Sequence, residues 1–485
     1  MQLKELLHAI PVKEYRGLLE TEVSSLCLDS RKIEKDGMFI AVRGHQTDGH
    51  HFIPQAIENG ALVIVLEEIP ELINENITYV LVDDSAYALG VIAANFYGNP
   101  SSNLKLVGVT GTNGKTTVAT LLFNLFTKLG YKVGLISTVQ NQIGEQILPS
   151  THTTPDPISL NFLLKLMQEA GCDYCFIEVS SHAIVQQRIA GLVFAGGIFT
   201  NLTHDHLDFH ENFLNYLNAK KKFFDDLNRN AFALTNTDDR NGQIMLQNTF
   251  AHRKTYGLRQ MADFKCKILE NHLDGMLLQV ENQEVLVKLV GEFNAYNLTA
   301  VYGTAILLEQ ETVKVLTALS EITGAKGRFE ILKANNGVTA IVDYAHTPDA
   351  VENILKTINQ FKKQGNRILT VLGCGGDRDK SKRPEMAAVA TNLSDKVILT
   401  SDNPRSEDPL KIISEMEAGV PADKRKNVFS ISDRKEAIRA AFHLANDGDI
   451  MLVAGKGHEN YQEINGVRNH FDDKEELTKI FNEYI

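Results

Sequence analysis

The sequence predicts an α/β protein of three domains, and three observations lead to that expectation. Apolar segments with strand character alternate with helical patterns along most of the 485 residues, which is typical of mostly parallel sheets. A chain of this length normally divides into several domains. Two stretches rich in turn-forming residues, 98–102 and 324–328, interrupt the alternation. We therefore expect domains at residues 1–98, 99–327 and 328–485.

The first expected domain is a small α/β unit. Apolar runs predict its strands, and a helical pattern lies between two of them. The expected strands are 25–28, 38–42, 62–66 and 79–82, and the expected helix is 52–59. The run Gly98-Asn99-Pro100-Ser101-Ser102 then marks the boundary.

The second and third domains repeat the same alternation on a larger scale. In the central domain we expect a mostly parallel sheet, followed by short antiparallel strands appended to it. The expected parallel strands are 104–109, 132–136, 174–179, 196–200 and 232–236, and the appended ones are 266–269, 276–280 and 284–289. Strands at 339–342, 367–372, 396–399 and 449–453 predict a C-terminal Rossmann-like, doubly wound domain.

Composition excludes several classes of protein. The chain has 49 basic and 61 acidic residues, a net charge of −12, and no basic stripe, which argues against a nucleic-acid partner. Five scattered cysteines are typical of a reducing compartment. No leader pattern and no apolar run of about 18 residues is present, so we expect a cytoplasmic protein without membrane insertion. Nothing in the sequence indicates an interface, and a monomer is the default expectation.

A glycine-rich segment between a strand and a helix is the most informative motif. Such a turn points backbone N–H groups at an anion, so we expect a phosphate-binding loop that holds ATP. Lys115 would reach the β- and γ-phosphates, and the Thr116 hydroxyl would bind Mg²⁺. The usual spacing is broken, because Val109 stands where the first glycine is expected. The loop residues are Gly111, Thr112, Asn113, Gly114, Lys115, Thr116 and Thr117.

Three further polar segments of the central domain follow or flank expected strands. Glu178 comes at a strand end, where a carboxylate beside a phosphate loop suits Mg²⁺. The segment 201–210 is dense in His and Asp, and one of its histidines is a candidate metal ligand. The run Ala219-Lys220-Lys221-Lys222 reads, by itself, as a solvated basic helix face.

The C-terminal domain places charged residues after four expected strands. Asp343 and His346 follow one of them, and Glu459 follows another. Arg378 and Arg405 stand after two more strands, where a guanidinium can bind a carboxylate in bidentate fashion. A site for a carboxylate at one end and an ammonium at the other suits an amino acid. Together with an ATP loop, this predicts ATP-driven amide bond formation.

These motifs, in this order, resemble those of the Mur ligase family across all three domains. The matching segments are 110–117, Glu178-Val179-Ser180-Ser181-His182, Asp205-His206-Leu207-Asp208, Ala219-Lys220, Gly291-Glu292-Phe293-Asn294 and Asp343-Tyr344-Ala345-His346. Leu28-Asp29-Ser30-Arg31 and the segment 44–49 resemble the branch that adds the third peptide residue.

The resemblance implies a reaction and its cofactors. ATP would phosphorylate the D-glutamate γ-carboxylate of UDP-N-acetylmuramoyl-L-Ala-D-Glu, and the amine of an amino acid would attack the acyl phosphate. Two Mg²⁺ ions would be held, one by Thr116 and Glu178 and the other by His206. Lys220 would carry a CO₂-derived carbamate that bridges the metal ions. This role replaces the interpretation of Lys220 as part of a solvated helix face. Lys115, Lys220, His206 and Glu178 would form the catalytic set.

The resemblance also implies the substrate contacts. ATP would meet Asn294, Arg328, Asp343 and His346 beyond the loop. The UDP-sugar and its peptide would lie on Leu28, Ser30, His45, Gln46, Thr47, Thr153, Thr154, Ser180, Gln186 and Arg188. The incoming amino acid would lie on Arg378, Asp402, Asn403, Pro404, Arg405, Gly455 and Glu459.

Arg405 decides which amino acid we expect. Relatives that take meso-diaminopimelate resemble this chain in having arginine after Asp402-Asn403-Pro404. Diaminopimelate differs from lysine by one extra carboxylate, and lysine would leave the guanidinium unpaired at a cost of about 2–5 kcal/mol. The alternatives are the same reaction with L-lysine, a folylpolyglutamate synthase-like ligase and a non-catalytic nucleotide-binding regulator. Residues 1–98 argue against the second, and the catalytic set argues against the third.

Overall fold

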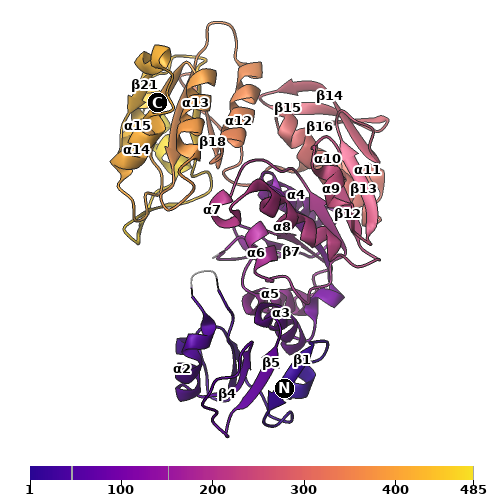
Figure 1. Ribbon diagram of the computed structural model, residues 1–485. Coiled ribbons are helices and arrows are strands. Elements are labelled where there is room, and N and C mark those ends of the chain that lie inside the picture. The colour runs from indigo at the N-terminus through magenta and orange to yellow at the C-terminus, as the bar shows by residue number, and fades with distance from the viewer. Residues whose placement is uncertain (45–46, 151, 484–485) are drawn as a thin grey trace.

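The computed structural model describes residues 1–44, 47–150 and 152–483. It has three units, each built on its own sheet (Figure 1). The N-terminal unit (indigo) lies at one end of the molecule, and the central unit lies between it and the C-terminal unit (orange to yellow). The predicted α/β fold class is therefore confirmed.

The N-terminal sheet has five strands in the order β1-β5-β4-β3-β2, and all neighbours but β1 and β5 are parallel. The edge strand β1 was missed because its side chains are mostly exposed and lack an apolar pattern. Helix α3, capped by the Asp84 side chain, packs against α5 of the central unit. The bounds are β1 Val12–Arg16, β2 Leu26–Cys27, β3 Gly37–Ile40, α2 Ile53–Glu58, β4 Ala61–Leu66, β5 Thr78–Val82 and α3 Ser85–Phe96.

The central sheet is a parallel sheet extended by antiparallel strands at both edges. Its order is β16-β15-β14-β13-β12-β11-β6-β10-β7-β8-β9. Pairing is parallel from β14 to β7, and β15, β16, β8 and β9 are antiparallel additions. The bounds are β6 Lys105–Thr110, β7 Val133–Ile136, β8 Asn141–Ile143, β9 Gln146–Leu148, β10 Tyr174–Glu178, β11 Gly196–Phe199, β12 Phe232–Asn236, β13 His252–Gly257, β14 Phe264–His272, β15 Gly275–Val280 and β16 Gln283–Val287.

Helices cover this sheet and bury its apolar residues in two clusters. Helix α4 begins directly after Gly114, whose φ of 90° is left-handed and suits glycine. The apolar residues of α4 begin only at Val118, because its first turn carries the polar residues of the loop. The bounds are α4 Lys115–Lys128, α5 Pro157–Glu169, α6 Ser181–Val185, α7 Leu207–His210, α8 Phe213–Asp225, α9 Gly242–Met245, α10 Glu292–Leu307 and α11 Thr312–Glu321.

The C-terminal sheet has the order β17-β18-β22-β19-β20-β21, with only β17 antiparallel. A separate hairpin, β23–β24, follows β22. The bounds are β17 Glu330–Lys333, β18 Thr339–Asp343, α12 Pro348–Phe361, β19 Ile368–Cys374, α13 Lys382–Leu393, β20 Lys396–Ser401, α14 Pro409–Glu417, β21 Val428–Ser430, α15 Arg434–Leu444, β22 Ile450–Ala454, β23 Tyr461–Ile464, β24 Val467–His470 and α16 Asp473–Glu483.

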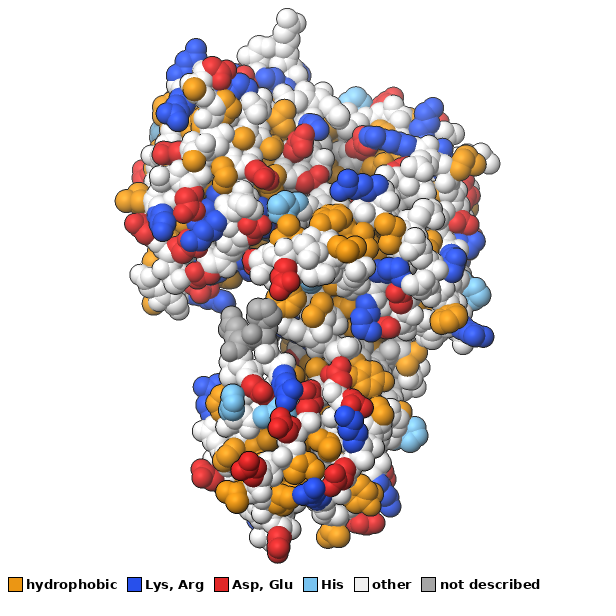
Figure 2. Space-filling model, viewed as in Figure 1, with side chains coloured by type: hydrophobic (Ala, Val, Ile, Leu, Met, Phe, Trp, Pro, Cys, Tyr) orange, Lys and Arg blue, Asp and Glu red, His pale blue; other side chains and the backbone are white. Residues whose placement is uncertain are grey.

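The cysteines, the apolarity of the helices and the surface charges are described next. All five cysteines are free and buried, which includes the Cys172 and Cys175 pair. Among the described helices, none combines the length and apolarity that a membrane crossing requires. On the face seen in Figure 2, acidic and basic side chains are mixed, and no continuous basic stripe runs across it.

Candidate functional site

The carboxyl ends of the central and C-terminal strands face each other across a cavity of about 370 Å³. Ligands of open α/β sheets bind at this edge. The predicted residues that line the cavity come from both units. They are Thr112, Asn113, Gly114, Lys115, Thr116, Thr117, Thr153, Thr154, Glu178, Ser180, Arg188, His206, Lys220, Arg328, His346, Arg378, Asp402, Asn403, Arg405, Gly455 and Glu459.

The phosphate loop is preformed between β6 and α4. Gly111 has a φ of 149° and packs so tightly that a Cβ would lie 1.9 Å from Thr200 Oγ1. Lys115 is folded back, and its Nζ donates to the carbonyls of Gly111 and Thr112 at 3.0 and 2.8 Å. The ammonium is therefore held within the loop, at the place where an anion would take over its hydrogen bonds.

Oxygen ligands gather around Glu178 at the end of β10. The Thr116 hydroxyl donates to Glu178 Oε2 at 3.0 Å, and the Thr138 N–H donates to Oε1 at 2.7 Å. Glu178 is only 1% exposed. A buried carboxylate beside a hydroxyl and a phosphate loop supplies the hard oxygen ligands that Mg²⁺ prefers.

The Lys220 ammonium lies on the opposite side of the loop and is 1% exposed. Its Nζ donates to the Gly111 carbonyl at 2.8 Å and lies 4.6 Å from the centre of the Tyr216 ring. Burial and the nearby Lys115 charge lower the pKa of Lys220 well below its usual range. Loss of a proton from this amine is therefore easier than from an exposed lysine.

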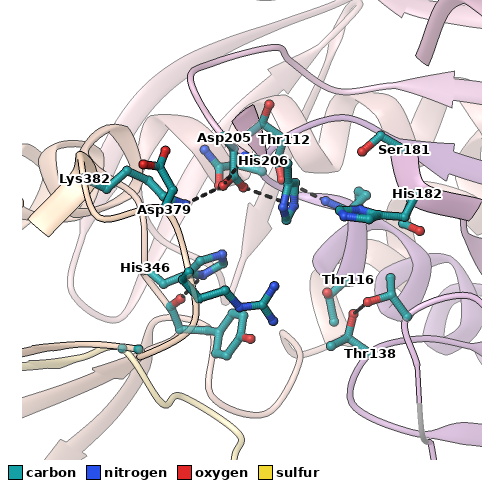
Figure 3. A pocket seen from close by; sticks show the side chains of 18 of the residues that line it. Thr112, Thr116, Thr138, Ser181, His182, Asp205, His206, His346, Asp379 and Lys382 are labelled. Atoms are coloured by element: carbon teal, nitrogen blue, oxygen red, sulfur yellow. Dashed lines mark hydrogen bonds and ion pairs between the residues drawn. The ribbon is translucent and has the colours of Figure 1, made fainter. Parts of the chain in front are cut away.

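The His206 imidazole lies beside the same cavity, next to an ion pair that crosses between units. Lys382 Nζ lies 2.6 Å from Asp205 Oδ1, and both side chains are buried. Figure 3 shows Lys382 pointing from the C-terminal unit toward Asp205, with His206 adjacent. Burial alone would raise the pKa of Asp205, but the charges of His206 and Lys382 lower it below its usual range. His204, in the same segment, lies with its Nε2 3.5 Å from Asp379 Oδ2 of the C-terminal unit.

No group of three or more His, Cys, Asp or Glu side chains converges on a metal position among the described residues. Magnesium does not require such a group, because it keeps several waters and takes substrate phosphate oxygens. Thr116 with Glu178 therefore fits one Mg²⁺ ion. Lys220 and His206 line the same cavity and fit a second ion only if the lysine becomes an anionic ligand.

A charged pocket forms the C-terminal end of the cavity. Asn403 Nδ2 donates to Glu459 Oε2 at 2.7 Å, and Asp402 is 7% exposed. Arg405 has a left-handed φ of 51°, and its Nη1 donates to the Gly376 carbonyl at 2.6 Å. Arg378 lines the same wall. The pocket therefore offers guanidinium groups and carboxylates to one ligand.

A second cavity, about 590 Å³, opens on the other side of the phosphate loop. Asn294, Asp343 and Arg328 line it together with Asn113 and the aromatic ring of Phe293. Burial raises the pKa of Asp343 to about 6. Arg328 reaches the loop, because its Nη2 donates to Thr116 Oγ1 at 3.1 Å. Its position beside the loop and its mixed lining suit the nucleoside part of ATP.

The predicted peptide contacts cluster near Glu178. Arg188 Nη1 donates to the Thr154 carbonyl at 2.7 Å, and its Nε donates to Gln186 Oε1 at 2.9 Å. Thr154 Oγ1 donates to the Glu178 carbonyl at 2.7 Å. These groups form one hydrogen-bonded wall at the N-terminal side of the cavity, where a carboxylate of a substrate would approach Arg188.

The predicted nucleotide-sugar contacts are not part of this cavity's described lining. Leu28 is 36% exposed on the N-terminal unit, and the buried Ser30 donates to Gln55 Oε1 at 2.6 Å. Thr47 is exposed, whereas His45 and Gln46 lie outside the described residues. Gly111 and Pro404 are not part of this cavity's described lining.

Several lining residues were not predicted from the sequence. Thr138 follows β7 at the same sheet edge, so the strand-end rule could have found it. The partnership of Asp205 with Lys382 joins residues 177 positions apart, which no local pattern reveals. Tyr216 does not line the cavity but supports residues that do: it shares a hydrogen bond of 3.1 Å with Thr112, and its ring centre lies 4.6 Å from Lys220 Nζ. Its sequence position is that of an ordinary apolar helix residue.

The chain matches three family descriptions in order. Residues 22–97 match "Mur ligase family, catalytic domain", residues 109–305 match "Mur ligase middle domain", and residues 327–457 match "Mur ligase, glutamate ligase domain". A protein of Bacteroides thetaiotaomicron named UDP-N-acetylmuramoyl-L-alanyl-D-glutamate–2,6-diaminopimelate ligase is 57% identical over 99% of this chain and 100% of its own length. A relative of the same name from Clostridium tetani is 41% identical, with 100% of both chains covered.

Solved structures of similar fold include members of the same family. One with that ligase name has a TM-score of 0.70 at 31% identity and covers 100% of this chain and 99% of its own. A folylpolyglutamate synthase of Mycobacterium tuberculosis shares the fold, with a TM-score of 0.62 at 16% identity, but matches only 77% of this chain and 93% of its own. On these matches over its full length, this chain belongs to the Mur ligase family.

Proposed function

We propose that this protein is an ATP-dependent ligase that adds meso-diaminopimelate to the D-glutamate γ-carboxylate of UDP-N-acetylmuramoyl-L-Ala-D-Glu, as a step in peptidoglycan precursor synthesis. The relatives that are 53–57% identical over nearly their whole length carry that activity in their names. The observation that carries the proposal is the single cavity that joins a phosphate loop to a pocket with Arg405 and Glu459.

The chemistry takes place where the two units meet. The γ-carboxylate attacks the γ-phosphorus of ATP and ADP leaves. The amine of diaminopimelate then attacks the acyl carbon, an amide C–N bond forms, and phosphate and a proton are released. The Lys115 ammonium gives up its hydrogen bonds to the loop carbonyls and binds the phosphates. The Arg328 guanidinium, whose Cζ lies 4.5 Å from the centre of the Tyr344 ring, approaches the phosphates from the C-terminal unit. These cations offset the charge that develops during phosphoryl transfer.

Two Mg²⁺ ions belong to the proposal, one on Thr116 and Glu178 and one on His206 and Lys220. Bound Mg²⁺ supplies positive charge to the phosphate oxygens. Lys220 would first react with CO₂: its neutral nitrogen forms an N–C bond, one proton is lost, and an anionic carbamate results. The buried, low-pKa amine supports this step, since only the unprotonated nitrogen carries a free electron pair.

The amino-acid pocket distinguishes diaminopimelate from lysine by charge. Arg405 and Arg378 would bind the distal carboxylate, with Asp402, Asn403, Pro404, Gly455 and Glu459 around the distal ammonium. Lysine lacks that carboxylate and leaves the guanidinium without a partner. We expect a preference for diaminopimelate of about 100-fold or more in kcat/KM.

Location, oligomeric state and domain limits complete the proposal. We place the enzyme in the cytoplasm as a monomer, where ATP is supplied and the five buried thiols stay reduced. We take 1–98 as the nucleotide-sugar domain, 99–327 as the ATP domain and 328–485 as the amino-acid domain. Leu28, Ser30, His45, Gln46 and Thr47 would hold the nucleotide sugar.

Phosphate release from ATP tests the function directly. The purified chain is given UDP-N-acetylmuramoyl-L-Ala-D-Glu with either meso-diaminopimelate or L-lysine, and phosphate is measured together with the peptide product. Release only with diaminopimelate supports the proposal. Preference for lysine would overturn the pocket assignment but keep the ligase, and no release with either amine would contradict the function.

A further inference from the structure

A buried lysine outside the expected substrate contacts lies behind the amino-acid pocket. Lys456 is the second residue after β22 and is fully buried, with 0% exposure. Its Nζ donates to Asn403 Oδ1 at 3.1 Å and to Glu459 Oε2 at 3.2 Å. Burying an ammonium is costly unless it is paired, so this arrangement needs the Glu459 carboxylate in its ionised form.

The same carboxylate is under opposing influences. Burial and the neighbouring Asp402 charge raise the pKa of Glu459, whereas Lys456 lowers it. The Asp402 side chain lines the same cavity as Glu459, and its charge is one of the causes that raise the pKa of Glu459. Two carboxylates at one site favour the sharing of a proton, and a protonated Glu459 would bind an ammonium poorly.

We propose that Lys456 is a positioning residue for the diaminopimelate ammonium: it holds Glu459 ionised and aims its free oxygen into the pocket. This inference rests on the proposed function. Lys456 engages Oε2, and Asn403 Nδ2 donates to the same atom at 2.7 Å. Among the residues that the structure describes, Oε1 accepts a hydrogen bond from the Tyr344 hydroxyl alone, at 3.5 Å, and is therefore the oxygen left for the ligand.

The hairpin β23–β24 completes the support. The N–H of Glu463 donates to Asn403 Oδ1 at 2.9 Å, and Gln462 Nε2 donates to the Asp402 carbonyl at 2.7 Å. The N–H of Arg405 donates to the Glu463 carbonyl at 3.0 Å. Lys456 and the hairpin thus hold the segment 402–405 from two sides.

Other charges face Glu459 from the elements around it. Arg434, at the start of α15, is 0% exposed and pairs with Asp473 of α16 at 2.7 Å. Arg468 of β24 stacks on the Tyr461 ring of β23 at 4.4 Å, and the same ring lies 5.5 Å from Lys456 Nζ. Arg434 and Arg468 already have their own partners, so Lys456 is the cation that bonds Glu459 itself.

The test compares Lys456→Met, Lys456→Arg and the matched control Lys362→Met. Lys362 follows α12, and its Nζ pairs with Asp395 at 3.0 Å away from the cavity. KM for diaminopimelate, KM for ATP and kcat are measured across the neutral range for each enzyme. We expect Lys456→Met to raise KM for diaminopimelate about tenfold or more, equivalent to one pKa unit, with KM for ATP unchanged.

The pH dependence separates this role from packing. Without the cation the pKa of Glu459 rises, so the carboxylate is protonated at the acidic end and recovers as pH rises. The variant-to-wild-type ratio of KM should therefore be largest at low pH and shrink at high pH, whereas Lys456→Arg and Lys362→Met should give flat ratios near one. A ratio for Lys456→Met that is constant with pH, or an equal rise in KM for ATP, would overturn the inference.

A second variant covers the case in which Lys456→Met fails to fold. Glu459→Gln imitates the protonated side chain, so its KM for diaminopimelate should be high at every pH. Lys456→Arg in that background should then add little. A wild-type enzyme that ignores diaminopimelate contradicts the proposed function. A wild-type enzyme that uses it, with a low and pH-independent KM for Glu459→Gln, contradicts the ligand contact of Glu459 and with it the role of Lys456, but leaves the ligase activity standing.

Discussion

At the scale of single residues, burial determines the chemistry of Lys220. The side chain donates to the Gly111 carbonyl, and burial together with the Lys115 charge lowers the pKa of its amine. A lowered pKa favours the neutral amine, which is the form that would react with CO₂. Its role therefore depends on its surroundings more than on the lysine-rich helix on which it lies.

Replacement of Lys220 by alanine should abolish turnover, because the site loses its anionic ligand. Added short carboxylates should restore part of the activity, and the wild-type enzyme should lose activity in CO₂-depleted buffer and regain it on addition of bicarbonate. Phosphate release is the measurement. Full activity in the unsupplemented alanine variant would rule out the carbamate.

Arg405 gives the second prediction at this scale. Its guanidinium is half-buried and has only the Gly376 carbonyl as a polar partner of its side chain among the contacts of the described residues. Arg405→Ala should raise KM for diaminopimelate about 100-fold, the effect of losing a hydrogen-bonded charge in a specificity site. KM for ATP should stay within about twofold. Equal effects on both substrates would make the arginine a structural residue.

At the scale of elements, the loop between β6 and α4 holds its shape through glycines in left-handed conformations. Gly114 has a φ of 90°, and a Cβ there would come within 2.7 Å of Asn297 Oδ1. Gly114→Ala should cost about 1–2 kcal/mol in backbone strain and displace the first turn of α4.

The measurable result for Gly114→Ala is a large rise in KM for ATP with a small loss in Tm. The matched control is Gly130→Ala, at the far end of α4, where φ is also left-handed but no atom lies within 4 Å of the Cβ. Gly130→Ala should lower Tm by a similar amount and leave KM for ATP unchanged. A similar KM for both variants would show that only backbone strain is involved.

Buried strands could be predicted from the sequence, whereas several exposed strands could not. Strands β6, β10, β11 and β12 could be predicted because they are buried on both faces and read as continuous apolar runs. Strands β1, β17 and β24 could not, since their side chains are mostly exposed or only half-buried and depend on a neighbouring strand for their conformation.

At the scale of the whole molecule, one buried ion pair joins the central and C-terminal units. Asp205 lies one residue before His206, and Lys382 begins the helix that follows the loop bearing Arg378. The pair therefore connects the His206 side of the cavity to the Arg378 side. A second contact, Asn113 Nδ2 to Asp349 Oδ2 at 2.9 Å, also joins the two units.

Lys382→Met should open the cavity between the two units. The loss of one partner from a buried pair typically costs about 3–5 kcal/mol, and separation of the units avoids that cost by solvating Asp205. Small-angle scattering should show a larger radius of gyration, and kcat should fall. Lys380→Met, which removes only a half-exposed partner of Glu407, is the control. An unchanged radius together with unchanged kcat would contradict the prediction.

The fold class and the family could be predicted from the sequence, because strand-end motifs lie in a fixed order along the chain. Strand ends predicted the loop and Glu178 at the edge of the central sheet and the pocket around Arg405 at the edge of the C-terminal sheet. Lys220 entered the predicted site only through the family resemblance. The structure places all of these residues around one cavity. Long-range partnerships such as that of Asp205 with Lys382 could not be predicted, since they depend on how two units meet. The individual roles of the site residues and the domain limits stay predictions.

Because all five cysteines are buried, fluorescent labels can be attached to this chain at chosen positions. No native thiol is accessible to maleimide dyes, so a cysteine introduced at an exposed position becomes the sole point of attachment. Leu72 on the N-terminal unit and Leu410 on the C-terminal unit are 91% and 63% exposed. A donor and an acceptor at these two positions would report, molecule by molecule, how the outer units move during each catalytic cycle.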